Sequence, residues 1–301
     1  MEPPARSVPL PQQLRERVER WIEDGVARHA GELTERELRT GVRALSALYV
    51  EGRSRHRGRL AARSLEGASK RAAFATYYAA LHLLTLLGVL DALADDPRFG
   101  GDWPGPLRRL LDLGCGTGAS GAAVGVTLPG ADGPPGLVGV DVSGWALADA
   151  RRTWRAFGLR GRTRRRALPA GAGRPGECEL AVAGWSINEL DDEARDGMLA
   201  WSRDHVAAGG ALLVVEPLAG SAVPWWSAWT SHLASVGCVD GEWKAEAPRL
   251  ERVERLDRAS GLDHRRLGAR WLAGPTRRPV SPPRRPGDGD GSRNRPAGGA
   301  W

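Results

Sequence analysis

Short apolar runs alternate with helical stretches over residues 105–275, and this alternation limits the possible folds most strongly. LRRLLDL, GLVGVDV, ELAVAGW and ALLVVEPL are strand-like runs of the kind that a buried parallel sheet requires. Helical stretches separate them, around residues 119–128, from Trp145 and from Asp191. Strands and helices that alternate at this spacing predict a doubly wound α/β domain.

The chain before this domain has helical periodicity. Apolar residues recur there at three- and four-residue steps, and Thr34 with Glu37 forms a capping-box pattern. We therefore expect an N-terminal helical cap over residues 12–100. The Pro-rich start, residues 1–11, and the Pro-, Gly- and Arg-rich tail, residues 276–301, are expected to be disordered because they cannot bury a core.

One segment of the cap has the composition of a membrane span. Residues 72–90 carry no charge, and their length approaches the ~20 residues that cross a bilayer. Ala, Thr, Gly and a His dilute the segment, and no second one follows. The sequence therefore favours a helix buried between two layers of a soluble protein, with no membrane association.

The composition permits an anionic partner without requiring one. The chain has 43 Lys and Arg against 36 Asp and Glu, a net charge of +7. Lys70 and Lys244 are its only lysines, and such an Arg bias also reflects a GC-rich genome. Three separated cysteines without a C-x-x-C pair argue against a disulfide framework or a metal site. Free thiols and a start without a signal-peptide core predict a cytoplasmic protein.

Two glycine patterns overlap after the first strand. Residues 110–118 read LLDLGCGTG, and residues 116–121, GTGASG, also match the dinucleotide fingerprint G-x-G-x-x-G. For a dinucleotide, the strand would have to continue through Gly114 and Cys115. The carboxylate of Asp112 would also repel a pyrophosphate, whereas it would attract a cationic amino group. The motif therefore favours a ligand with an amino group over NAD.

The glycine turn, Asp-Leu-Gly-x-Gly-x-Gly, resembles motif I of the class I S-adenosylmethionine-dependent methyltransferases. The resemblance covers residues 107–216 and implies a Rossmann-like methyltransferase sheet, S-adenosylmethionine as cofactor and methyl transfer as activity. It assigns cofactor-binding roles to Asp112, Gly114, Gly116, Gly118, Asp141, Val142 and Ser186.

These roles differ from residue to residue. The resemblance implies that Asp112 orients the methionine amino group and that the glycines let the backbone approach the ligand. Asp141 would accept the ribose hydroxyls, Val142 would contact adenine, and Ser186 would line the methyl-transfer side. The alternative for Asp112 and Asp141 is capping of the following helices. The family often has an acid after the third strand, where this chain has three arginines at residues 164–166.

Two residues are candidates for the chemistry itself. Trp185 ends the fourth strand and would line the methyl-transfer side or belong to the core, and Glu216 ends the fifth as the candidate polar catalytic residue. The segment VPWWSAWTSH ends at His232. Its tryptophans form either an aromatic wall over the cofactor or a packing surface for the N-terminal helices. The segment after strand four lacks the Pro-Pro-aromatic pattern of nucleic-acid amino methylases, and no Pro-Cys pair is present.

The acceptor stays open among small molecules, RNA and proteins, as does the oligomeric state. Residues 52–71 and 160–166 are basic and are candidates for RNA contact. The combination of ALSALYVEGR, Asn188-Glu189-Leu190 and VVEPL is also similar, more faintly, to the methyltransferase-like assembly factors of the mitochondrial small ribosomal subunit and their bacterial relatives. The alternative function is therefore an RNA-binding or ribosome-assembly factor with little or no turnover.

Overall fold

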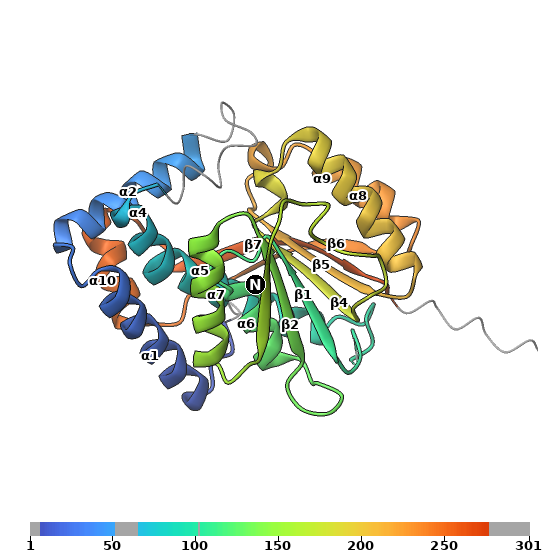
Figure 1. Cartoon of the computed structure of the whole chain (residues 1–301), viewed down its shortest axis with the longest axis horizontal. Coiled ribbons are helices and arrows are strands. Elements are labelled where there is room, and N and C mark those ends of the chain that lie inside the picture. Colours follow the sequence, from blue (N-terminus) through green and yellow to red (C-terminus); the bar gives the residue numbers. More distant parts are fainter. Residues whose placement is uncertain (1–6, 52–65, 102, 277–301) are drawn as a thin grey trace, which may run out of the picture.

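Seven strands form one twisted sheet (Figure 1). The computed structural model describes residues 7–51, 66–101 and 103–276. The strand order is β3-β2-β1-β4-β5-β7-β6. The strands are β1 (Arg109–Leu113), β2 (Gly136–Asp141), β3 (Gly161–Arg165), β4 (Leu180–Gly184), β5 (Ala211–Glu216), β6 (Val239–Glu246) and β7 (Arg266–Gly274).

Strands β1 to β5 are parallel to one another, and β7 runs antiparallel between β5 and β6. This sheet is the α/β fold that the apolar runs predict. The strand order reverses between β1 and β4, because β2 and β3 lie on one side of β1 while β4 and β5 lie on the other. In open α/β sheets, ligands bind in the crevice at the carboxyl ends of the strands beside such a point.

Helices cover both faces of the sheet. They are α1 (Gln12–His29), α2 (Glu35–Glu51), α4 (Ala68–Ala73), the π-helical η2 (Phe74–Tyr78), α5 (Ala79–Ala94), α6 (Ala119–Thr127), α7 (Gly144–Ala156), α8 (Asp192–Ala207), α9 (Trp226–Ala234) and α10 (Glu251–Ser260). Two short 3₁₀ turns are η3 (Ile187–Glu189) and η4 (Gly220–Ala222). The larger hydrophobic cluster includes residues of α1, α2, α5, α6, α7 and α10, and the smaller one those of α8 and α9.

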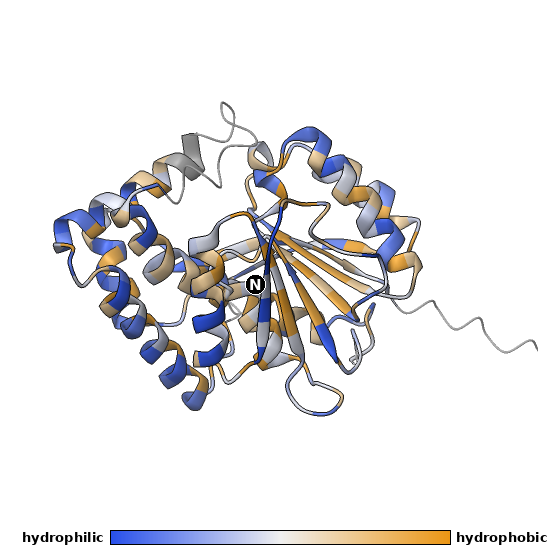
Figure 2. Cartoon of the chain, in the orientation of Figure 1, coloured by the Kyte–Doolittle hydropathy of each residue, from blue (hydrophilic) through white to orange (hydrophobic). Residues whose placement is uncertain are grey.

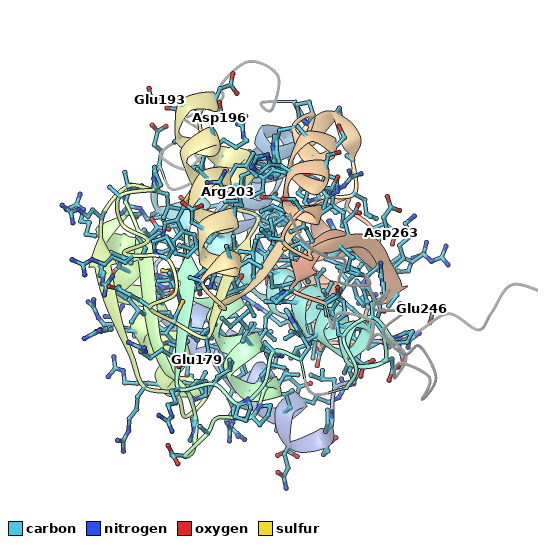
Figure 3. All side chains as sticks on the ribbon, turned by 90° about the vertical axis from the view of Figure 1, so that its right-hand side faces the viewer. Glu179, Glu193, Asp196, Arg203, Glu246 and Asp263 are labelled. Carbon is cyan, nitrogen blue, oxygen red and sulfur yellow. The ribbon has the colours of Figure 1, made fainter. Side chains whose placement is uncertain are left out.

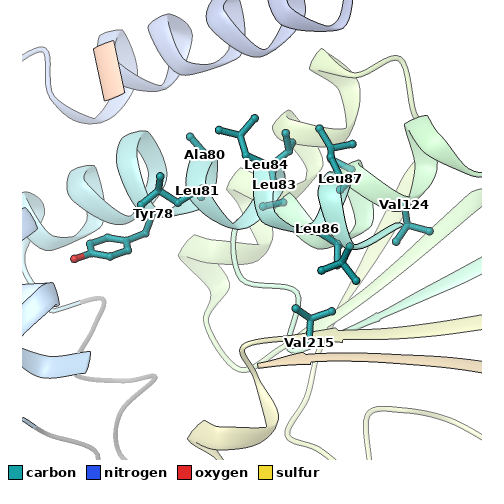
Figure 4. Packing of buried hydrophobic residues seen from close by; sticks show 14 of the residues in the cluster. Tyr78, Ala80, Leu81, Leu83, Leu84, Leu86, Leu87, Val124 and Val215 are labelled. Atoms are coloured by element: carbon teal, nitrogen blue, oxygen red, sulfur yellow. The ribbon is translucent and has the colours of Figure 1, made fainter. Parts of the chain in front are cut away.

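The apolar segment of the cap is a buried helix. Elements α4, η2 and α5 form one continuous helix, Ala68–Ala94, which alone in the described residues is long and apolar enough to span a membrane. Within the molecule, 89% of its most apolar window is buried. Figure 4 shows it beside the sheet, with Leu86 lying toward Val215 of β5. The prediction of a buried helix is confirmed.

The helical region and the sheet share one hydrophobic core, which joins Val18 and Val42 to strand residues such as Leu110. Figure 2 shows the same division, with orange concentrated in the central strands and blue on the outer surfaces of α1 and α8. The capping box of α2 is present, because the N–H of Thr34 donates to Oε2 of Glu37 (2.8 Å).

The start of the chain differs in part from its expectation of disorder. Residues 7–11 lie against the sheet edge, where Ser7 forms a parallel bridge with Glu246 and Val8 is buried. An apolar side chain at position 8 explains this, since the exposed edge of β6 gives it a surface to cover. Residues 1–6, 52–65 and 277–301 lie outside the described part, and with them most of the predicted tail and of one basic stretch.

Candidate functional site

A cavity of about 930 Å³ opens at the carboxyl ends of the parallel strands. Its lining comes from the glycine turn after β1, the ends of β2 and β4, the cavity-facing side of η2 and α5, and the start of β7. Its volume lies within the range of ~300–1,000 Å³ that small-molecule sites occupy. The strand-order reversal therefore coincides with a cavity of the size that a small-molecule ligand needs.

The glycine turn has a conformation that other residues rarely adopt. The φ angles of Gly114, Gly116 and Gly118 are 65°, 50° and 83°, all in the left-handed region that favours glycine. At Gly114 a Cβ would also lie 2.4 Å from Cβ of Ser186. Gly114 and Gly116 line the cavity, whereas Gly118 lies behind them against Trp154.

Asp141 joins the glycine turn to the end of β2. Its Oδ2 accepts the N–H of Gly116 (2.9 Å) and its Oδ1 the N–H of Ser143 (2.7 Å). Burial raises the pKa of Asp141 while these N–H donors lower it. The carboxylate lines the cavity beside Val142, whose side chain is 49% exposed, the only exposed large hydrophobic residue in the described chain.

Asp112 lies beneath the cavity and does not line it. The carboxylate is fully buried, and its Oδ2 accepts the N–H of Gly121 (2.8 Å) in the first turn of α6. Its Oδ1 has no hydrogen-bond partner in the described structure. Burial raises the pKa of Asp112 to about 7. This is the helix-capping geometry, and a contact with the cofactor's amino group stays a prediction.

The residues that follow β4 lie in the cavity wall. Ser186 is buried, and its Oγ donates to the carbonyl of Leu113 (2.7 Å), which ties the end of β4 to the glycine turn. Trp185 has a φ of 56°, and it is the only residue other than glycine with a positive φ in the described chain. Its indole stacks on the imidazole of His82, with ring centroids 4.0 Å apart.

Glu216 is not placed in the cavity wall. It is fully buried, and its Oε1 accepts the N–H groups of Ile187 (3.0 Å) and Asn188 (3.1 Å) at the start of η3. The structure therefore gives Glu216 a part in holding the turn after β4. A carboxylate at the end of a buried strand satisfies its neighbour's free N–H groups before it reaches a ligand.

The tryptophan cluster is also elsewhere. Trp226 and Trp229 belong to the smaller hydrophobic cluster on the α8–α9 face, where Trp225 packs against it, and none of the three lines the cavity. Both interpretations of this cluster, as a wall over the cofactor or as a surface for the N-terminal helices, are wrong. The reason is topological: α9 follows β5 and covers the face opposite to α5. His232 is exposed on α9, outside the cavity lining.

Sequence reasoning missed the contribution of the cap to the site. Phe74 of η2 faces the glycine turn, where a Cβ on Gly116 would lie 3.6 Å from its ring. His82 of α5 and His264 before β7 also line the cavity. Burial lowers the pKa of His82 to about 3, so its ring is neutral near pH 7. The structure marks this part of the cap by the π-helical turn at residues 74–78, a form that is frequent at functional sites. This turn is not visible in the sequence.

The segment after β3 lines the cavity without an acid. Arg166, Ala167 and Leu168 line the cavity where the sequence resemblance implies a carboxylate. Among the described residues no group of three or more His, Cys, Asp or Glu could hold a metal ion.

Comparison with known proteins gives one sequence relative and many structural ones. The ribosomal RNA large subunit methyltransferase G of Streptomyces coelicolor is 36% identical over 118 residues, which are 37% of this chain and 30% of that protein. The match thus spans less than a third of the relative's length. No family model matches the chain.

Solved structures of methyltransferases are similar at low identity. Magnesium protoporphyrin IX methyltransferase of Synechocystis PCC 6803, with bound SAM, is 15% identical with a TM-score of 0.39; the match covers 64% of this chain and 78% of that one. Ribosomal protein L11 methylase of Lactobacillus delbrueckii subsp. bulgaricus is 15% identical with a TM-score of 0.37, over 63% and 76% of the two chains.

The strand order, with its reversal between β1 and β4 and the glycine turn at that point, is the arrangement that the sequence resemblance implies. The chain has the class I methyltransferase fold. The resemblance carried by the sequence of the glycine turn is confirmed at this level. In the methyltransferase fold of this chain, Gly114, Gly116, Asp141, Val142 and Ser186 come together at one cavity, with Trp185 beside them.

Proposed function

We propose that this protein is an S-adenosylmethionine-dependent methyltransferase. The single observation that carries the proposal is the position of Asp141, whose carboxylate lines the cavity between the glycine turn and the exposed side chain of Val142. S-adenosylmethionine, when bound, supplies an electrophilic methyl group on a positively charged sulfur atom.

The residues of this wall fit such a cofactor. Each oxygen of Asp141 accepts one backbone N–H, and a carboxylate oxygen has a second lone pair that a ribose hydroxyl can use. Val142 offers an apolar surface to a base. Gly114 and Gly116 bring backbone rather than side chains to the cavity surface. A dinucleotide fits less well, because the carboxylate of Asp141 lies against the glycine turn, where it would repel a pyrophosphate.

The acceptor occupies the remainder of the cavity in this proposal. Trp185, His82 and His264 line it with aromatic and imidazole groups from three different elements. Stacking on His82 fixes the ring of Trp185 beside the turn that Ser186 ties to the glycine loop. Positioning of two reactants can supply about 7–11 kcal/mol of a barrier, so the site needs no separate catalytic dyad.

Free Cys115, Cys178 and Cys238 support a cytoplasmic location.

Calorimetric titration with S-adenosylhomocysteine, and with NADH as a second ligand, tests the proposal. We expect binding of S-adenosylhomocysteine alone, and loss of about 1.5–3 kcal/mol of binding free energy in Asp141→Ala, since a charged hydrogen-bond acceptor is removed. Asp132→Ala, on an exposed loop, is the matched control. Absence of binding at millimolar ligand overturns the methyltransferase proposal and leaves the alternative, a factor of the same fold without turnover.

A further inference from the structure

An acid-free, arginine-rich segment follows the middle of α7. From Asp149 to Glu177 the chain contains nine arginines and not one Asp or Glu between them. The segment comprises the end of α7, the whole of β3 and the loop after it. A GC-rich genome explains arginine in place of lysine, but it does not explain the exclusion of acids from 27 consecutive positions.

These arginines converge on one edge of the molecule. Eight of them are exposed, and we call six of these the arginine strip: Arg151, Arg155, Arg160, Arg162, Arg165 and Arg166. Within the described residues none of the six forms an ion pair; in this segment only Arg152 does, with Asp149 at 3.8 Å. Figure 3 shows nitrogen-tipped side chains along the yellow-green ribbon of this edge, while the labelled Glu193 and Asp196 lie on α8.

Protection of a sheet edge does not account for the whole strip. β3 is an edge strand, and charged side chains on such a strand prevent pairing with other chains. One or two charges suffice for that purpose, and the strip continues onto α7, which has no free edge. Arg162 lies in β3, with Arg160 directly before the strand and Arg165 at its carboxyl end, so guanidinium groups follow one another along this edge as phosphates do along an RNA strand.

The strip leads to the mouth of the cavity. Arg166 lines the cavity itself. Arg165 donates from Nε to the carbonyl of Val142 (3.0 Å), the residue that we place against adenine. Because β3 is parallel to β2, its carboxyl end with these two arginines lies at the same edge of the sheet as the glycine turn.

We propose that the arginine strip binds the phosphate backbone of RNA and directs a nucleotide toward the cavity; the second half of this statement rests on the proposed function. Clustered guanidinium groups on one exposed edge, without an ion pair among the described residues, are the electrostatic pattern of nucleic-acid binding. The acceptor class that this assigns is an RNA base or ribose rather than a free small molecule.

Fluorescence anisotropy with a fluorescein-labelled RNA hairpin carrying a single-stranded tail tests the proposal on the full chain. The double variant Arg160→Glu, Arg162→Glu reverses two charges of the strip without touching the cavity. Arg36→Glu, Arg249→Glu is the control with the same charge change at exposed positions outside the strip, on α2 and after β6. Arg160→Lys, Arg162→Lys keeps the charges.

We expect the strip variant to weaken RNA binding at least ~10-fold and to lower the salt dependence by about one to two phosphate contacts, while the control and the lysine variant bind as the wild type does. Equal loss in the strip and control variants overturns the proposal, because binding is then unspecific. So does binding of polyglutamate in place of RNA, which would indicate an acidic protein partner.

Titration of the same preparations with S-adenosylhomocysteine separates the two proposals. Intact cofactor binding in the strip variant shows that it is folded, so that lost RNA binding reports on the strip alone. If the wild type binds S-adenosylhomocysteine but not the hairpin, the strip proposal fails and the methyltransferase proposal stands. If the wild type binds the hairpin but not S-adenosylhomocysteine, the methyltransferase proposal fails and the strip's binding of RNA stands.

Discussion

The imidazole of His82 lies flat against the indole of Trp185, with ring planes 6° from parallel. The two rings come from the buried helix α5 and from the residue after β4, so this contact joins the helical cap to the wall of the cavity. Trp185 adopts a positive φ, which costs a residue with a side chain about 1–2 kcal/mol. Strain of this kind is common where a site fixes a side chain.

The neutral state of His82 predicts a pH dependence of stability. Its folded pKa of about 3 lies below the unfolded value near 6.5, so below that pH the unfolded chain takes up a proton and the folded chain does not. We therefore expect wild-type stability to decrease by up to about 2 kcal/mol more than that of His82→Phe between pH 6.5 and 5. Urea denaturation at several pH values measures this difference, with the exposed His232→Gln as the control. Parallel curves of unfolding free energy against pH for the wild type and His82→Phe would contradict the prediction.

The buried carboxyl of Asp112 predicts the opposite slope. Its folded pKa of about 7 is above the unfolded value, so its contribution to stability is complete below pH ~4 and is lost as the pH rises toward 7. Asp112→Asn does not titrate, and we expect its unfolding free energy, relative to wild type, to increase by about 2 kcal/mol from pH 5 to pH 7. The exposed variant Asp132→Asn should leave the slope unchanged. A constant difference across this range would show that Asp112 is ionised throughout.

Glu216 is expected to act on the turn after β4 and not on a substrate. Glu216→Gln keeps a carbonyl oxygen that can accept the two N–H bonds of η3, whereas Glu216→Ala leaves both donors buried without it. We expect the alanine variant to lose about 3 kcal/mol of stability and to bind S-adenosylhomocysteine more weakly, with the glutamine variant close to wild type. Calorimetry and urea denaturation measure both effects. A glutamine variant as damaged as alanine would assign the role to the negative charge.

The fold and the cofactor wall could be predicted from local patterns. Buried parallel strands are continuously apolar, and a left-handed turn requires glycine, so β1, β2, β4, β5 and the turn at Gly114 are visible in the sequence. Asp141 could be predicted as a residue of the cavity wall because it lies at the end of the second strand. β3 could not be found this way, because an exposed edge strand carries arginines on both faces and reads as a basic loop.

Side-chain direction across the fold could not be predicted. Aromatic residues at helical spacing, such as Phe74 and His82, look like core until the helix is placed over the glycine turn. Trp226 and Trp229 look like a cavity wall until topology assigns α9 to the other face. Likewise, a carboxylate at a strand end, such as Glu216, is either a ligand contact or a cap, and only the neighbouring N–H groups distinguish the two.

A hydrogen-bonded cluster of Tyr77, Asp257 and His264 holds α10 against the cap. The hydroxyl of Tyr77 donates to Oδ1 of Asp257, and Nδ1 of His264 lies 2.7 Å from the same oxygen. Tyr77 is fully buried, and burial together with the carboxylate of Asp257 raises its pKa above the ordinary range. The phenol is therefore protonated near neutral pH and donates to the carboxylate.

Removal of this donor is expected to loosen the joint between cap and sheet. Tyr77→Phe leaves a buried carboxylate short of one hydrogen bond, which costs about 1–3 kcal/mol of unfolding free energy. Tyr78→Phe is the matched comparison, because its hydroxyl bonds to neutral groups, the carbonyl of Val42 (3.3 Å) and the side chain of Ser46, and it should lose less. A double-mutant cycle with Asp257→Asn should give a coupling of at least ~0.5 kcal/mol between Tyr77 and Asp257. Additive losses would show that the two groups act independently and that packing alone holds α10 in place.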